Sequence, residues 1–150
     1  MLHLVKTNAN NTDFIQLVQL LDADLAIRDG KDHAFYNQFN KIDAIKYAVV
    51  AYINEKPVGC GAIKEYDATT VEVKRMYTLP EYRGKGVALQ VLQALEEWAA
   101  TLHFSKCILE TGKKQPEAIA LYKRNGYKTI PNYGQYAGVE NSVCFEKVIG

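Results

Sequence analysis

The stretch KRMYTLPEYRGKGVALQ, Lys74 to Gln90, decides the fold, because a strand-like run there meets a helix-like run through RGKGVA, Arg83 to Ala88. The start of a helix has unpaired N–H groups and a partial positive charge, and glycine lets an anion approach the backbone closely. The junction therefore suits a phosphate or pyrophosphate, although such a stretch also occurs as a plain turn. Neither GxxxxGK[ST] nor GxGxxG is present, since Leu89 occupies the third glycine position.

The flanking sequence predicts an α+β fold, a mixed α/β sandwich. Apolar and β-branched runs predict strands at Leu2–Lys6, Ile45–Ile53, Val58–Glu65, Val71–Leu79, Cys107–Glu110, Tyr127–Ile130 and Ser142–Val148. Helical spacing predicts helices at Phe14–Ile27, Ala34–Lys41, Val87–Leu102 and Glu117–Arg124. Three consecutive strands with short connections, followed by a β-α-β crossover, indicate a mixed, mostly antiparallel sheet flanked by helices.

Composition restricts the classes of function. The chain has 150 residues and a net charge near +1, so we expect one domain over 1–150 and no nucleic-acid or membrane partner. Cys60, Cys107 and Cys144 lie far apart in apolar runs, which favours buried free thiols over a disulfide or a metal site. No secretion segment or apolar run of spanning length occurs, so we expect a cytoplasmic protein.

Two motifs resemble those of the GNAT superfamily of acyl-CoA-dependent N-acyltransferases. Arg83, Gly86 and Ala88 meet the family pattern Q/R-x-x-G-x-G/A of motif A, and QPEAIALYKRNGY, 115–127, is similar to motif B. The predicted order of elements is also that of the family. The resemblance is strong over 71–127 and loose over the first 45 residues, where members differ with their acceptor.

The resemblance implies acetyl-CoA as co-substrate and assigns residues to it. Backbone N–H groups of the junction would hold the pyrophosphate, and the preceding strand would contact the pantetheine and acyl group. Gln115 falls near a position where the family commonly has a cofactor-contacting asparagine. The implied cofactor-binding residues are Met76, Tyr77, Thr78, Arg83, Gly84, Lys85, Gly86, Val87, Ala88, Gln115 and Tyr122.

The same resemblance suggests three catalytic residues. The Met76 N–H would face the thioester carbonyl, and Tyr122 would protonate the leaving thiolate, unless it is only a packed aromatic. Glu72 matches the general base of histone-acetylating members. Positions 72, 74 and 76 of an extended strand face one side, so Lys74 would keep Glu72 ionised and make it a poorer base. An exposed strand carboxylate, with another residue or a water chain as base, is the alternative.

The resemblance implies that the acceptor is a primary amine of a small molecule or peptide, which the sequence does not identify. It also places the acceptor pocket at 29–40 and 132–141, and the aromatic and amide groups there suggest that Tyr36, Tyr133 and Tyr136 bind the acceptor, although such groups also occur in ordinary packing. A non-catalytic acyl-CoA or metabolite-binding module and a different nucleotide-dependent enzyme remain alternatives. Exposed sheet edges make a homodimer a further expectation.

Overall fold

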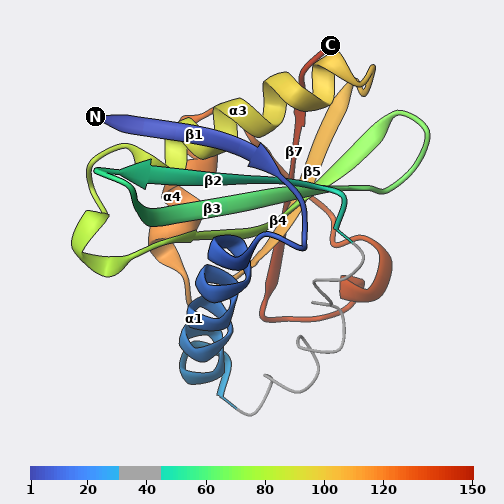
Figure 1. Ribbon diagram of the computed structural model, residues 1–150. Coiled ribbons are helices and arrows are strands. Elements are labelled where there is room, and N and C mark those ends of the chain that lie inside the picture. Colours follow the sequence, from blue (N-terminus) through green and yellow to red (C-terminus); the bar gives the residue numbers. More distant parts are fainter. Residues whose placement is uncertain (31–44) are drawn as a thin grey trace.

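The computed structural model describes residues 1–30 and 45–150 as a seven-stranded sheet with helices on both faces (Figure 1). The strands are β1 (Leu2–Thr7), β2 (Tyr47–Ile53), β3 (Lys56–Glu65), β4 (Thr70–Thr78), β5 (Lys106–Gly112), β6 (Lys128–Ile130) and β7 (Ser142–Val148). The helices are α1 (Thr12–Asp29), α3 (Val87–Thr101) and α4 (Pro116–Arg124), with 3₁₀ turns η3 (Pro80–Tyr82) and η4 (Gly134–Tyr136). The predicted fold class is confirmed; the predicted helix Ala34–Lys41 lies outside the described residues.

The sheet is antiparallel except at one place. Its order is β1-β2-β3-β4-β5-β7-β6, and only β4 and β5 run parallel. The predicted meander therefore extends to four strands, because β1 also pairs antiparallel with β2. The crossover through α3 joins the two parallel strands, as a β-α-β connection requires.

Each face of the sheet has its own core. On one face Val91, Leu92 and Leu95 of α3 pack with Val71 and Leu109 of the sheet. On the other face Phe14, Leu17 and Val18 of α1 pack with alternate residues of β2 and β3. We call these the α3 face and the α1 face, and Figure 1 shows the two helices on opposite sides of the sheet.

A β-bulge interrupts β4 at Arg75, which has a φ of 60°. Val71 and Val73 lie on the α3 face, while Glu72 and Lys74 lie on the α1 face. The extra residue shifts the alternation of side chains between the two faces by one position, so Met76 packs in the α3-face core. Arg75 instead lies on the α1 face, where its Nη1 donates a hydrogen bond to Asp22 Oδ1 of α1 at 2.9 Å. The expectation that 72, 74 and 76 share one side is thus wrong for Met76.

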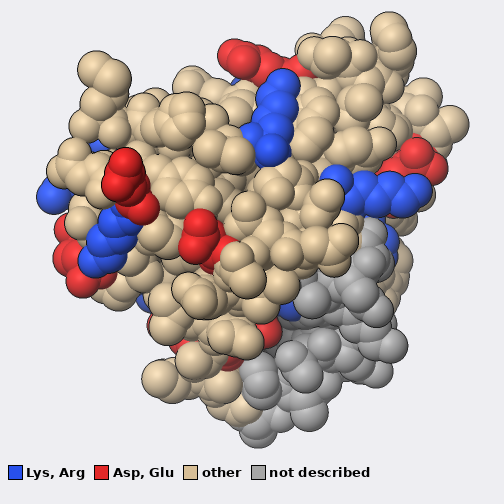
Figure 2. Space-filling model, viewed as in Figure 1, with Lys and Arg blue, Asp and Glu red and all other residues tan. Residues whose placement is uncertain are grey.

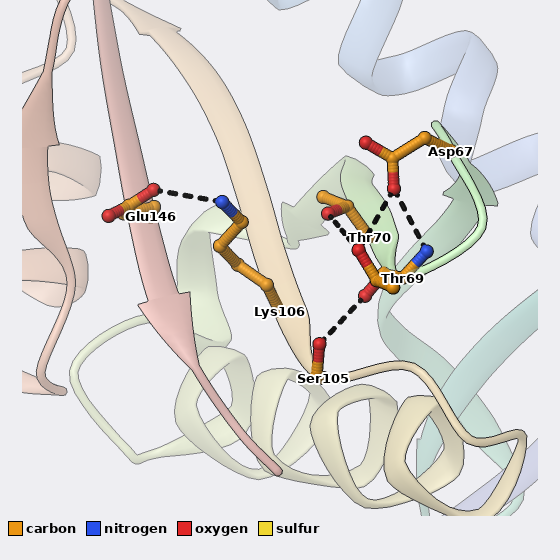
Figure 3. Close-up of polar contacts among 6 residues, drawn as sticks. All are labelled: Asp67, Thr69, Thr70, Ser105, Lys106 and Glu146. Carbon is orange, nitrogen blue, oxygen red and sulfur yellow. Dashed lines mark hydrogen bonds and ion pairs between the residues drawn. The ribbon is translucent and has the colours of Figure 1, made fainter.

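Strands β4 and β5 are joined at one end and separate at the other. They pair at Thr70–Lys106, Val71–Cys107 and Glu72–Ile108, although β4 continues to Thr78 and β5 to Gly112. At the joined end the Ser105 hydroxyl donates to the Thr69 carbonyl at 3.3 Å, and Asp67 caps the turn (Figure 3). Beyond Glu72 and Ile108 the sheet has a gap between its two parallel strands.

The three cysteines are free and fully buried, as predicted. Burial raises the pKa of the Cys60 and Cys107 thiols to about 12 and that of Cys144 to about 11. None of the helices within residues 1–30 and 45–150 has the length and apolar character needed to cross a bilayer. On the face in Figure 2, charged side chains of the described residues lie singly or as adjacent acidic and basic groups among neutral ones.

Candidate functional site

A cleft of about 770 Å³ opens where β4 and β5 separate. Its size lies within the range of small-molecule sites. Residues from α1, β4, the 83–89 turn, the end of β5, α4 and η4 line it. Because the strands part there, the cleft is lined from both faces of the sheet, by Tyr122 of the α3-face core and by Glu72 and Lys74 of the α1 face.

The turn before α3 presents a row of unused backbone donors. Tyr82 and Arg83 donate their N–H groups to Leu79 and Pro80, and Gln90 donates to Gly86. Between them, the N–H groups of residues 84–89 donate to no acceptor among the described residues. We call this region the amide end of the cleft. Unpaired amides at a helix N-terminus form an anion site.

The two glycines of the turn are required by its shape. Gly84 and Gly86 have φ of +77° and +83°, and a Cβ at either would meet nothing within 4 Å. The positive φ explains the choice of glycine, and the open space leaves room for an anion beside the amides. Both observations fit a bound pyrophosphate.

The basic side chains of the turn differ in position. Arg83 donates from Nε to the Thr78 carbonyl at 2.9 Å and lies over the Tyr77 ring, so it fastens the turn to β4 while lining the cleft. Lys85 lies with its Nζ 5.4 Å from the Tyr82 ring centroid and is not among the lining residues. The structure therefore brings Arg83 to the cleft and leaves Lys85 outside it.

Tyr122 of α4 lines the middle of the cleft. Its ring packs against Tyr127 and Phe145, with centroids 5.6 and 6.1 Å away. Its hydroxyl makes no hydrogen bond to another described residue. Burial raises the pKa of this phenol, so it stays protonated at neutral pH and available as a donor.

At the other end of the cleft Glu72 is held by two partners. Tyr133, from the β6–β7 loop, donates to Glu72 Oε2 at 2.6 Å, and Lys74 Nζ lies 3.8 Å from Oε1. Glu72 is 8 % exposed, so it is not the exposed carboxylate of the alternative interpretation. Burial raises the pKa of Tyr133, and the neighbouring Glu72 carboxylate raises it further.

A second carboxylate, on β5, faces the same gap. Glu110 accepts a hydrogen bond from the Ser142 hydroxyl at 2.7 Å and lines the cleft beside Tyr136. The Tyr133 and Tyr136 rings meet edge to face with centroids 5.8 Å apart. We call Glu72, Lys74, Glu110, Tyr133, Tyr136 and Ser142 the carboxylate end of the cleft.

An ion pair joins helices from the two faces of the sheet. Arg28 of α1 contacts both Asp24 of the same helix, at 3.1 Å, and Glu117 of α4. All three side chains line the cleft. This pair therefore connects the two helices across the part of the cleft where the sheet is open.

Most of the predicted site residues meet in this cleft. The lining includes Glu72, Met76, Tyr77, Thr78, Arg83, Gly84, Gly86, Val87, Ala88, Gln115, Tyr122 and Tyr136. Tyr133 reaches it through Glu72, and Tyr36 lies outside the described residues. Glu110 and Arg28 were not among the predicted site residues, whereas the expected position of Lys74 beside Glu72 is confirmed by their 3.8 Å separation. The signal for Glu110 was a carboxylate that ends the apolar run CIL.

Known proteins resemble this chain over the same elements. The model of the acetyltransferase (GNAT) family matches residues 14–127. An "IAA acetyltransferase" of Azospirillum brasilense is 36 % identical over 91 residues, 60 % of each chain. The N-acetyltransferase YsnE of Bacillus subtilis is 35 % identical over 99 residues, 65 % of this chain and 66 % of its own. The matched segments thus span less than two thirds of these curated relatives.

Solved structures agree over the full length. A crystal structure of an acyl-CoA N-acyltransferase from Klebsiella pneumoniae has a TM-score of 0.84 and 31 % identity, covering 100 % of this chain and 99 % of its own. The PaiA N-acetyltransferase of Thermoplasma acidophilum, solved with coenzyme A, has a TM-score of 0.73 at 17 % identity, covering 99 % of both chains. With the family model matching most of the sequence, the chain belongs to the GNAT family of acetyltransferases.

Proposed function

We propose that this protein transfers the acetyl group of acetyl-CoA to a primary amine of a small molecule or peptide, by direct attack in a ternary complex. The observation that carries the proposal is the row of unused N–H groups at residues 84–89, which opens on the same cleft as Tyr122. The coenzyme A complex of the Thermoplasma protein, which shares the fold, supports this choice of donor.

The amide end would hold the donor. The N–H groups from Gly84 to Leu89 would bind the pyrophosphate, with Arg83 beside them and Gln115 at the start of α4. The main chain of Met76, Tyr77 and Thr78 would guide the pantetheine along β4, although the Thr78 carbonyl already accepts from Arg83. The bound thioester supplies the acyl group, and the chain's own residues orient it.

Two groups near the gap would serve the transfer. The Met76 N–H would stabilise negative charge on the carbonyl oxygen, and a preorganised donor of this kind contributes about 3 kcal/mol. Tyr122 would protonate the departing sulfur, because the residue lines the cleft and its hydroxyl is protonated and without a described protein partner. Its packed ring fixes where that proton is delivered.

The carboxylate end would receive the amine. An amine acceptor arrives protonated, so a carboxylate that binds the ammonium also serves as an acceptor for its proton. Glu72 is our candidate, directly or through water, since Tyr133 fixes one carboxylate oxygen and leaves Oε1 on the side of Lys74. Tyr136 and Tyr133 would form the aromatic wall of the acceptor pocket.

A thiol-release assay with acetyl-CoA and a panel of primary amines tests this function. Wild-type protein should release coenzyme A with at least one amine, and mass spectrometry should find the acetylated product. Coenzyme binding, measured separately by calorimetry, separates the outcomes. Tight binding without turnover across a broad panel would favour a binding module, and binding of ATP that acetyl-CoA cannot displace would favour another nucleotide-dependent enzyme.

A further inference from the structure

Lys74 has a position in the cleft that the proposed reaction leaves without a role. Among the described residues that line the cleft, it is the only lysine and therefore the only side chain with a primary amine. Its side chain is 9 % exposed, and burial lowers the pKa of its ammonium below the ordinary value, against the opposing effect of Glu72. A primary amine is the chemical class of acceptor that we propose for this site.

The strand register puts Lys74 at the gap itself. The last pair that joins β4 and β5 is Glu72 with Ile108, so Lys74 and Glu110 come two residues later on strands that have just separated. Because side chains alternate along a strand, both lie on the same face as Glu72. The route from the α3 face to the α1 face through the sheet therefore passes between Lys74 and Glu110.

A proton acceptor for this amine is already in place. Lys74 Nζ is 3.8 Å from Glu72 Oε1, and the Tyr133 hydroxyl holds the other oxygen of the same carboxylate at 2.6 Å. The hydrogen bond from Tyr133 limits the rotation of the Glu72 carboxylate, which keeps Oε1 toward Lys74. Glu72 is thus placed to accept a proton from the Lys74 ammonium, as it would from the ammonium of an external acceptor.

We propose that Lys74 is a self-acetylation site, modified by acetyl-CoA bound in the same cleft; this inference rests on the proposed function. The ammonium gives one proton to Glu72, and the neutral nitrogen attacks the thioester carbonyl carbon. A C–N bond forms and the C–S bond breaks. The sulfur leaves as thiolate and takes a proton from Tyr122, and the second proton of the attacking nitrogen passes through water to the Tyr122 oxygen. The products are an amide on Lys74 and free coenzyme A, and the proton on Glu72 is released to solvent.

The modification would act on the acceptor site. Acetyl-Lys74 carries no charge, so Glu72 loses its cationic partner and the gap gains an acetamide group. The acetamide group hinders an external amine, because it fills space at the route to the thioester. Self-acetylation would thus slow turnover when acetyl-CoA is abundant and the acceptor is scarce.

The test needs no identified acceptor. Purified protein is incubated with acetyl-CoA alone, and peptide mapping by mass spectrometry follows acetylation of each lysine over time. Lys147 is the matched internal control, because it is also paired with a carboxylate, Glu96 at 2.9 Å, but does not line the cleft. We expect Lys74 to be acetylated at least about tenfold faster than Lys147, since the donor is held beside it.

Two variants decide whether the cleft is responsible. Gly86→Val, which impairs the amide end, should reduce acetylation of Lys74 to the rate of Lys147. Wild-type protein should lose thiol-release activity slowly during preincubation with acetyl-CoA, whereas Lys74→Arg should show neither the modification nor this loss. Equal rates at the two lysines, or a Lys74 rate unchanged in Gly86→Val, would overturn the inference.

The same samples separate this inference from the proposed function. If an added amine is acetylated while Lys74 stays unmodified, the inference fails and the proposed function holds. If coenzyme A binds but neither Lys74 nor any amine is acetylated, both fail.

Discussion

The amide end and the carboxylate end of the cleft are built by different means. At the amide end the donors are main-chain N–H groups of one continuous turn, residues 84–89. At the carboxylate end the polar atoms are side chains from β4, β5, β7 and the β6–β7 loop, held to one another by hydrogen bonds. One end depends on a local backbone shape, whereas the other depends on the packing of distant segments.

The amide end is therefore the part of the cleft that different sequences can share, and the carboxylate end is the part that is specific to each sequence. Backbone donors are insensitive to the side chains around them, so a turn with glycines at 84 and 86 recognises the same anion in many sequences. A pocket made of side chains changes with each substitution. We therefore expect mutations at the amide end to affect coenzyme binding and mutations at the carboxylate end to affect the acceptor.

The largest effect should come from the group between the two ends. Tyr122→Phe removes the proton donor but keeps the ring contacts with Tyr127 and Phe145, so kcat should fall about 100-fold with little change in the Kd of coenzyme A. Steady-state kinetics on an amine from the panel, with calorimetry for the Kd, measures both. An unchanged kcat would remove Tyr122 from the chemistry.

The second-largest effect should come from a mutation at the amide end, and it should lower the affinity for coenzyme A. Gly86→Val places a branched side chain in the space beside the amides and strains a φ of +83°, so affinity for coenzyme A should fall at least about tenfold, or about 1.4 kcal/mol. Gly138→Val is the matched control, since Gly138 has φ +78° and equally open surroundings in another loop. Equal losses of affinity in both variants would mean that strain, and not the anion site, is responsible.

A mutation at the carboxylate end should lower the stability of the fold without changing the affinity for coenzyme A. Tyr133→Phe removes the donor to the buried Glu72 carboxylate and should lower the free energy of unfolding by about 1–2 kcal/mol, with an unchanged Kd for coenzyme A. Urea unfolding measures the loss. Tyr66→Phe, which removes a hydroxyl from an exposed tyrosine but keeps the ring that packs edge to face on Tyr133, should change stability by less than about 0.5 kcal/mol.

The same hydrogen bond has a defined pH dependence. The pKa of Tyr133 is raised in the folded state. The stabilisation that the neutral Tyr133 hydroxyl gives the folded state is therefore complete below the unfolded-state pKa, and it is lost as the pH rises through the folded-state pKa. The difference between wild type and Tyr133→Phe should be constant from about pH 7 to 9 and shrink above about pH 10. A difference that grows above that pH would contradict the assigned hydrogen bond.

The smallest effect should come from the joined end of β4 and β5, outside the cleft. Lys106 and Glu146 pair at 3.4 Å with side chains more than a third exposed (Figure 3). Glu146→Gln should therefore change stability by less than about 0.5 kcal/mol. It should leave coenzyme binding and turnover unchanged. A clear kinetic effect would show that the joined end controls the width of the gap.

The local sequence identified more of the residues at the amide end than of the contacts at the carboxylate end. Gly84 and Gly86 lie in a compact turn whose suitability for an anion follows from the local sequence, Tyr122 was indicated by the resemblance to the family's motif B, and the cleft contains all three. The contact of Tyr133 with Glu72 joins residues 61 positions apart, so only the folded sheet reveals it. The bulge at Arg75 was also invisible, because a non-glycine residue with positive φ has no signal in its own identity.

The buried thiols have a practical consequence for work on this protein. Disulfide reagents that reveal free coenzyme A react with thiolates, and burial leaves Cys60, Cys107 and Cys144 protonated and out of reach. The folded protein should therefore contribute almost no colour of its own, even at high concentration. Slow acyl transfer can then be followed with micromolar amounts of catalyst, and a sudden rise in background would report unfolding.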